Sequence, residues 1–137
     1  MLKILLNFIS IVVVNSYSNE IDYDQLIYKD GLLYQKEITE IFTGYVNGIQ
    51  NGKVVNGLKE GKWKGFYENG NLLWSGFYNN GLNVSKWVEY HNNGKVFTIG
   101  HFDNGKKIGV WSFYDKHGKK IADEIYKNNS VITKIYK

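Results

Sequence analysis

One interval organises most of this chain: Trp63, Trp87 and Trp111 lie 24 residues apart. Further columns keep the same interval, namely an aromatic three positions on (Phe66, Tyr90, Tyr114), a glycine (Gly70, Gly94, Gly118) and a second aromatic (Tyr78, Phe102, Tyr126). A fixed period of this length is typical of stacked supersecondary units, each burying its apolar surface against the next. The period therefore favours a repeat array with a binding or scaffolding role over a catalytic domain.

Each unit is predicted to contain two strands and two turns. Asn-Gly is the strongest hairpin signal, because a type I′ turn needs positive φ at both central residues. The pair stands at positions 47–48, 51–52, 56–57, 69–70, 80–81, 93–94 and 104–105. The repeat glycines assigned to turns are Gly70, Gly81, Gly94, Gly105 and Gly118. With no proline and 16% aromatic residues, the composition suits short strands and excludes disorder.

The predicted fold is all-β: an elongated single-layer antiparallel meander of stacked β-hairpin repeats with a 24-residue period. Gly76 and Gly100 fall inside strands and predict bulges that coil the sheet. Side chains alternate along a strand, so the tryptophan ladder and the Phe66 ladder should lie on opposite faces. One ladder is expected to pack on the inner side of the coiled sheet; the sequence leaves open which.

The ends of the array are predicted to be irregular, as capping repeats are. The predicted divisions are a signal peptide (1–18), degenerate N-terminal repeats or a cap (19–58), three repeats (59–130) and a C-terminal capping strand (131–137). Gly52 to Gly57 is read as a shortened form of Gly70 to Gly81. At the other end, Ile135 stands where a fourth tryptophan would fall.

The first eighteen residues predict export. Lys3 precedes a mostly apolar run, residues 4–14, and Ser16 and Ser18 supply the small side chains that a cleavage site after Ser18 needs. The run is shorter than the roughly 20 apolar residues of a transmembrane helix. The alternative interpretation is a buried strand or first cap. Export would place the protein in the periplasm, on the cell surface or outside the cell.

The charge distribution and the reactive side chains give little support for a nucleic-acid-binding protein, an enzyme or a metalloprotein. The net charge of +4 is spread along the chain, whereas nucleic-acid binders concentrate basic residues on one face. The chain has no cysteine, and His91, His101 and His117 occupy three different repeat positions. We therefore expect no catalytic residues, no metal site, no cofactor and no small-molecule substrate.

The residues themselves resemble a known repeat. The pattern Gly61-Lys62-Trp63-x-x-Phe66-Tyr67-x-Asn69-Gly70 is similar to the bacterial variant of the MORN repeat, and residues 107–114 restate its core. The segment 41–44 (Ile-Phe-Thr-Gly) resembles the lead-in of YwqK-type antitoxin proteins. The resemblance implies a single-layer sheet of hairpins that serves as an interaction or scaffold module. For the antitoxin family it implies neutralisation of a toxin by binding.

The functional prediction is an exported, non-enzymatic protein that binds another protein through an aromatic-lined sheet surface, as a surface or secreted host-interaction factor. One alternative is an antitoxin or immunity protein that binds a toxin; another is a membrane-surface adaptor with weak affinity for lipid headgroups. The candidate binding residues are Trp63, Trp74, Trp87, Trp111, Tyr67, Tyr90 and Tyr114. Trp74 stands out because its counterparts are Thr98 and Ala122.

Overall fold

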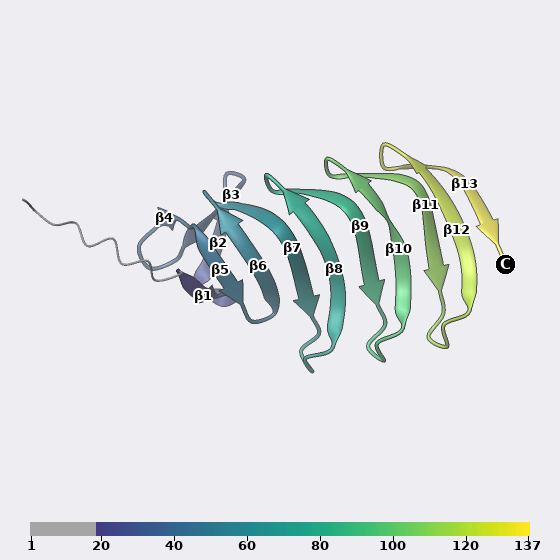
Figure 1. The fold of residues 1–137 in the computed structure, drawn as a ribbon, viewed down its shortest axis with the longest axis horizontal. Coiled ribbons are helices and arrows are strands. Elements are labelled where there is room, and N and C mark those ends of the chain that lie inside the picture. Colours follow the sequence, from purple (N-terminus) through teal and green to yellow (C-terminus); the bar gives the residue numbers. More distant parts are fainter. Residues whose placement is uncertain (1–18) are drawn as a thin grey trace, which may run out of the picture.

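The computed structural model describes residues 19–137, and the predicted signal peptide lies outside these residues. Most of the described chain forms one open sheet of ten strands (Figure 1). The strands of this long sheet, in spatial order, are β1 (Glu20–Asp22), β5 (Gly44–Asn47), β6 (Gln50–Val55), β7 (Leu58–Phe66), β8 (Leu72–Asn79), β9 (Leu82–Tyr90), β10 (Val96–Asp103), β11 (Lys106–Tyr114), β12 (Lys120–Lys127) and β13 (Ser130–Tyr136). From β5 onward each strand pairs antiparallel with the next.

The predicted all-β, single-layer meander is confirmed for this long sheet. The N-terminal part departs from it. A 3₁₀ turn, η1 (Tyr23–Gln25), leads into a separate sheet of β2 (Leu26–Lys29), β3 (Leu32–Gln35) and β4 (Glu40–Ile41). We call residues 23–42 the N-terminal module. β1 precedes this module but pairs with β5, and that pairing is parallel.

The two ends of the hairpins use different turns. At one end, Asn80 and Gly81 have φ of 49° and 78°, as a type I′ turn requires, and positions 56–57 and 104–105 repeat this geometry. At the other end, Gly70 has positive φ and Asn69 does not. There Tyr67 N–H donates to Asn71 O and Gly70 N–H to Tyr67 O, which closes a longer loop. Gly70, Gly94 and Gly118 therefore lie in turns, but not in two-residue type I′ turns.

The prediction of a turn at Asn51-Gly52 is wrong, because both residues lie inside β6. Gly52 stands 24 residues before Gly76, so it belongs to the mid-strand glycine column rather than to the turn column. The first unit is nevertheless short. The missing residues fall in the loop between β5 and β6. That loop comprises only residues 48–49, whereas residues 67–71 join β7 to β8.

The mid-strand glycines do mark irregularities in the ladder. The pairing of β6 with β7 shifts at Gly52, that of β8 with β9 at Gly76, and that of β10 with β11 at Gly100. This confirms the bulges predicted at Gly76 and Gly100. The facing strand holds a residue of positive φ at each shift: Gly61 (69°), Ser85 (59°) and Gly109 (64°). Ser85 thus adopts a left-handed conformation that favours glycine.

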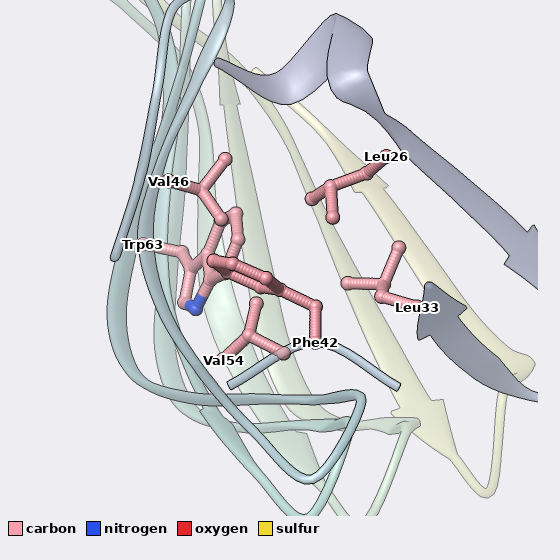
Figure 2. Packing of buried hydrophobic residues seen from close by; sticks show 6 residues of the cluster. All are labelled: Leu26, Leu33, Phe42, Val46, Val54 and Trp63. Atoms are coloured by element: carbon pink, nitrogen blue, oxygen red, sulfur yellow. The ribbon is translucent and has the colours of Figure 1, made fainter. Parts of the chain in front are cut away.

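The N-terminal module packs on one face of the long sheet and creates a small two-layer core. Figure 2 shows Val46, Val54 and Trp63 pointing from the curved sheet toward Leu26 and Leu33, with Phe42 between the layers. All six side chains are buried. We call the face that carries Trp63 the inner face and its reverse the outer face.

Candidate functional site: the inner face of the long sheet

Aromatic side chains form one continuous row across the inner face. The row runs Trp63, Tyr78, Trp87, Phe102, Trp111 and Tyr126, with neighbouring ring centroids 6.1, 5.7, 5.5, 5.1 and 6.1 Å apart. Every contact is edge-to-face, the arrangement that aromatic quadrupoles favour. The row therefore joins β7 to β12 through side chains as well as through backbone hydrogen bonds.

Each tryptophan of the row lies flat on a glycine of the preceding strand. A Cβ built at Gly52 would come within 2.2 Å of the Trp63 ring, at Gly76 within 1.9 Å of Trp87, and at Gly100 within 2.1 Å of Trp111. No side chain fits beneath the rings at these distances. The glycines of this column allow the tryptophan rings to lie directly on the backbone of the preceding strand. The sequence predicted a bulge at these glycines but not this close contact.

This seating leaves the tryptophans of the column little exposed surface. Trp63 and Trp111 are 0% exposed and Trp87 is 7% exposed. Their ring surface is taken up by the glycines, by the intervening Tyr78, Phe102 and Tyr126, and, over Trp63, by the N-terminal module. The intervening rings are only half-buried and offer the accessible aromatic surface of the row.

Trp74 lies on the same face, outside the column. Its ring stacks on Trp87 with centroids 4.8 Å apart and planes 13° apart. It also covers Gly65, where a Cβ would come within 2.1 Å of the indole nitrogen. Trp74 is half-buried, so it is the most accessible of the four tryptophans. The sequence singled it out because it breaks the repeat, and that signal pointed to the tryptophan whose ring is only partly buried.

The other predicted binding residues, Tyr67, Tyr90 and Tyr114, lie at the long-loop end of the hairpins. The Tyr67 hydroxyl donates to the Tyr90 carbonyl, 2.7 Å away, and so links two successive hairpins. One repeat later, His91 replaces the tyrosine and its Nε2 lies 2.9 Å from the Tyr114 carbonyl. Because a carbonyl only accepts, that nitrogen carries the proton. Tyr67 thus takes part in hydrogen bonds between repeats through its hydroxyl, and Tyr90 and Tyr114 take part through their backbone carbonyls.

Two lysines that are separated by two repeats lie over the aromatic row. The Lys59 ammonium is 4.3 Å from the Trp63 ring centroid and 5.1 Å from that of Tyr78. The Lys107 ammonium is 4.2 Å from Trp111 and 5.2 Å from Tyr126. The middle repeat has Asn83 at this position. Cations over ring faces are attracted by the ring quadrupole, so the two lysines add positive charge to the inner face. Sequence reasoning missed both, although their 48-residue separation is two periods.

Lys59 lies in a cleft of about 320 Å³ between the N-terminal module and the β7–β9 hairpins. Tyr23, Tyr28, Leu33 and Tyr78 line it with Lys59. Burial lowers the pKa of Lys59 to about 8. Its ammonium donates to Gln50 Oε1 at 2.5 Å, and within residues 19–137 no carboxylate lies within ion-pair distance of it. The cleft therefore presents a partly desolvated cation.

The row ends at β12 in an ion pair. Glu124 replaces the column glycine and pairs in register with Trp111 on one side and Lys134 on the other. Lys134 Nζ lies 2.5 Å from Glu124 Oε1, and this bond lowers the pKa of Glu124. Lys134, rather than Ile135, thus occupies the fourth tryptophan position. The sequence count fails by one because the β12–β13 bulge is shorter than the earlier ones.

The titratable groups of the described residues do not assemble into a metal-binding cluster. In residues 19–137 no three His, Cys, Asp or Glu side chains are placed to hold a metal ion. His101 is exposed on β10, and His117 lies in a long loop, where its carbonyl accepts from Lys95. No helix in the same part of the chain is long and apolar enough to cross a membrane.

Comparison with known families agrees with the repeat geometry. Residues 59–80 and 84–104 match the family described as MORN repeat variant. These segments correspond to β7–β8 and β9–β10, so each matched repeat is one hairpin. No curated protein matches the chain. MORN repeats generally serve as protein- or membrane-binding modules. The chain therefore contains two MORN repeat variants, and β11–β12 adds a third hairpin with the same 24-residue spacing.

Proposed function

We propose that this chain is a non-catalytic repeat module that binds another protein through the inner face of its long sheet. The observation that carries the proposal is the unequal cover of the aromatic row. The N-terminal module covers the row at Trp63. The hydrophobic cluster that the module forms with the inner face reaches Trp74 and Tyr78 on β8 and does not include the half-buried Phe102 and Tyr126.

The N-terminal module itself indicates how a partner segment would bind. Leu26 and Leu33 place apolar side chains against the inner face and become buried there. Aromatic anchors in well-packed surroundings contribute most of the affinity of protein interfaces. A partner that laid apolar side chains over Trp74 and Phe102 would use the same kind of contact.

Site-specific crosslinking in cells that express the protein tests this proposal. A photoreactive amino acid replaces Tyr126 on the inner face or, as the matched control, Lys64, which is exposed on the outer face. Crosslinks to a defined protein from position 126 and not from position 64 would support the proposal. The same partner from both positions, or from position 64 alone, would contradict it. Rebinding of the purified partner to a Phe102→Ser variant should then be at least about tenfold weaker.

A second candidate function has its own supporting observation on the outer face. Tyr45 is 50% exposed there, next to the exposed Lys53 in register, and Lys62 and Lys64 are exposed on the neighbouring strand. Lysines beside an exposed tyrosine are the composition that anionic membrane surfaces attract. This adaptor function predicts binding to phosphatidylserine vesicles that salt weakens and that Lys62→Gln/Lys64→Gln abolishes. Equal binding to neutral vesicles would contradict it.

Export is proposed on the basis of the apolar run at residues 4–14. The mass and N-terminal sequence of the protein from fractionated cells test it. A chain that begins at Asn19 in the envelope or medium supports an exported, host-facing or envelope partner. A full-length cytoplasmic chain would instead favour the antitoxin alternative, in which the partner is a toxin.

A further inference from the structure

The spacing of the two inner-face lysines suggests which kind of segment the inner face binds. Lys59 is on β7 and Lys107 is on β11, and the intervening order β7-β8-β9-β10-β11 contains four strand-to-strand steps. At about 4.8 Å a step, the two strands lie roughly 19 Å apart. An extended chain rises about 3.3 Å per residue, so six residues cover this distance.

Because six is an even number, the two residues at the ends of such a segment point to the same side of it. Side chains of an extended segment alternate between two sides, so residues at positions i, i+2, i+4 and i+6 all face the same way. A segment that runs across the strands would therefore direct its first and seventh side chains toward Lys59 and Lys107. The two side chains between them would face Trp74 and Phe102, which are half-buried on the same face.

Charge decides the chemistry at the two ends. Aromatic rings surround both ammonium groups, and within the described residues neither one makes an ion pair. Each ammonium has three donors, and the Lys59 ammonium makes one side-chain hydrogen bond, to Gln50. A carboxylate would satisfy the remaining donors and offset the cost of burying the cation.

We propose that the inner face binds an extended segment of a partner protein that carries two acidic side chains six residues apart, with apolar residues at the inward positions between them. One carboxylate pairs with Lys59 in its cleft, and the other pairs with Lys107. Asn83 occupies the lysine position of the middle repeat and is uncharged, and the acidic side chain of that repeat on the inner face is Glu89, in register with Trp74. This inference rests on the proposed function, because it specifies the partner of the same inner face.

Synthetic peptides test the spacing and the charge separately. The probe is acetyl-Glu-Thr-Tyr-Thr-Val-Thr-Glu-amide. One control has glutamine at both ends and the other has its glutamates at the first and fifth positions. Backbone amide shifts of the full chain, followed by NMR, report where each peptide binds. We expect the probe to shift amides beside Lys59 and Lys107. It should bind about tenfold more tightly than the control with shifted glutamates, which keeps one ion pair, and about a hundredfold more tightly than the glutamine control, which keeps neither.

Three variants locate the two ion pairs. Lys59→Gln and Lys107→Gln should each weaken the probe about tenfold and leave the glutamine peptide unchanged, whereas Lys64→Gln on the outer face should have no effect. The wild-type comparison of peptides keeps the test valid if a variant fails to fold. Equal binding of all three peptides, or no shift at about 1 mM peptide, would overturn the inference.

The two proposals fail in different ways. If the crosslinked partner binds Lys59→Gln and Lys107→Gln as well as it binds the wild type, the acidic segment is wrong and the inner-face function stands. If the partner crosslinks only to the outer face, the inner-face function is wrong as well.

Discussion

Trp63 and Trp111 occupy the same repeat position and are both fully buried, yet they are covered in different ways. Trp63 lies beneath a second layer, with Phe42, Leu26 and Leu33 packed around it. Trp111 lies in a single-layer part of the sheet, where Phe102, Tyr126 and Lys107 close over it. The comparison shows that this repeat buries its tryptophan with side chains of the sheet itself and needs no second layer. The second layer is then an addition, and the rest of the inner face lies outside the two-layer core.

The largest difference in stability between the Trp63 and Trp111 ends of the row should come from truncating the side chains that cover these two tryptophans. Phe42→Ala takes a nearly fully buried ring out of the two-layer core and should lower the free energy of unfolding by about 3–5 kcal/mol. Tyr126→Ala removes a half-buried ring and should cost about 1–2 kcal/mol. Urea unfolding measures both. Equal losses would contradict the distinction between a two-layer and a single-layer end.

A smaller contrast should come from the glycines beneath the tryptophans. Gly52→Ala and Gly100→Ala each place a Cβ about 2 Å from an indole ring, so the ring must move. Trp63 is held by the N-terminal module, whereas Trp111 can shift toward solvent. We expect a loss of about 3 kcal/mol for Gly52→Ala and about 1–2 kcal/mol for Gly100→Ala. Thermal unfolding followed by circular dichroism measures the two losses. A larger loss for Gly100→Ala than for Gly52→Ala would contradict the different cover of the two tryptophans.

The two regions also differ in how much of their structure could be predicted from the sequence. The 24-residue period and the Asn-Gly turns at 56–57, 80–81 and 104–105 can be read directly from the sequence. They were enough to predict the antiparallel meander of the long sheet. Gly52 was misread as a turn because Asn51-Gly52 matches the turn signal, and only the packing of Trp63 reveals its role. The N-terminal module and the parallel β1–β5 pair depend on non-local contacts. The candidate residues suffered the same limit, since the repeat marks the tryptophan column without showing that packing buries it. Trp74, which breaks the repeat, is the tryptophan that the sequence could single out.

The middle repeat offers a matched pair of substitutions at the bulge. Ser85 has φ of 59°, and Gly109, with φ of 64°, is its counterpart one repeat later. Ser85→Gly should raise the free energy of unfolding by about 1 kcal/mol, and Gly109→Ser should lower it by a similar amount. Nothing lies within 4 Å of a Cβ at Gly109, so the backbone conformation alone decides the sign. Chemical denaturation of the two variants checks it, and two changes of the same sign would be incompatible with this explanation.

The smallest effect is expected from pH at the covered end. Burial lowers the pKa of Lys59 to about 8 from 10.5, so between these values the unfolded chain binds more protons than the folded one. Stability should therefore be flat, with respect to Lys59, below pH 8 and rise modestly from pH 8 to pH 10. Partial exposure of the lysine limits the rise. The Lys59→Met variant should lack it, and an identical pH profile for both proteins would show that Lys59 is not desolvated.

The central claim is that the tryptophan column is closed by packing while Trp74 and the rings between the tryptophans remain accessible. Hydroxyl-radical footprinting with mass spectrometry measures this residue by residue in the intact protein. Trp74 should be oxidised fastest among the tryptophans, and Trp63 and Trp111 should be protected to a similar degree at the two ends of the row. Oxidation of Trp111 at the rate of Trp74 would contradict the claim, because the single-layer part of the sheet would then fail to bury its own tryptophan.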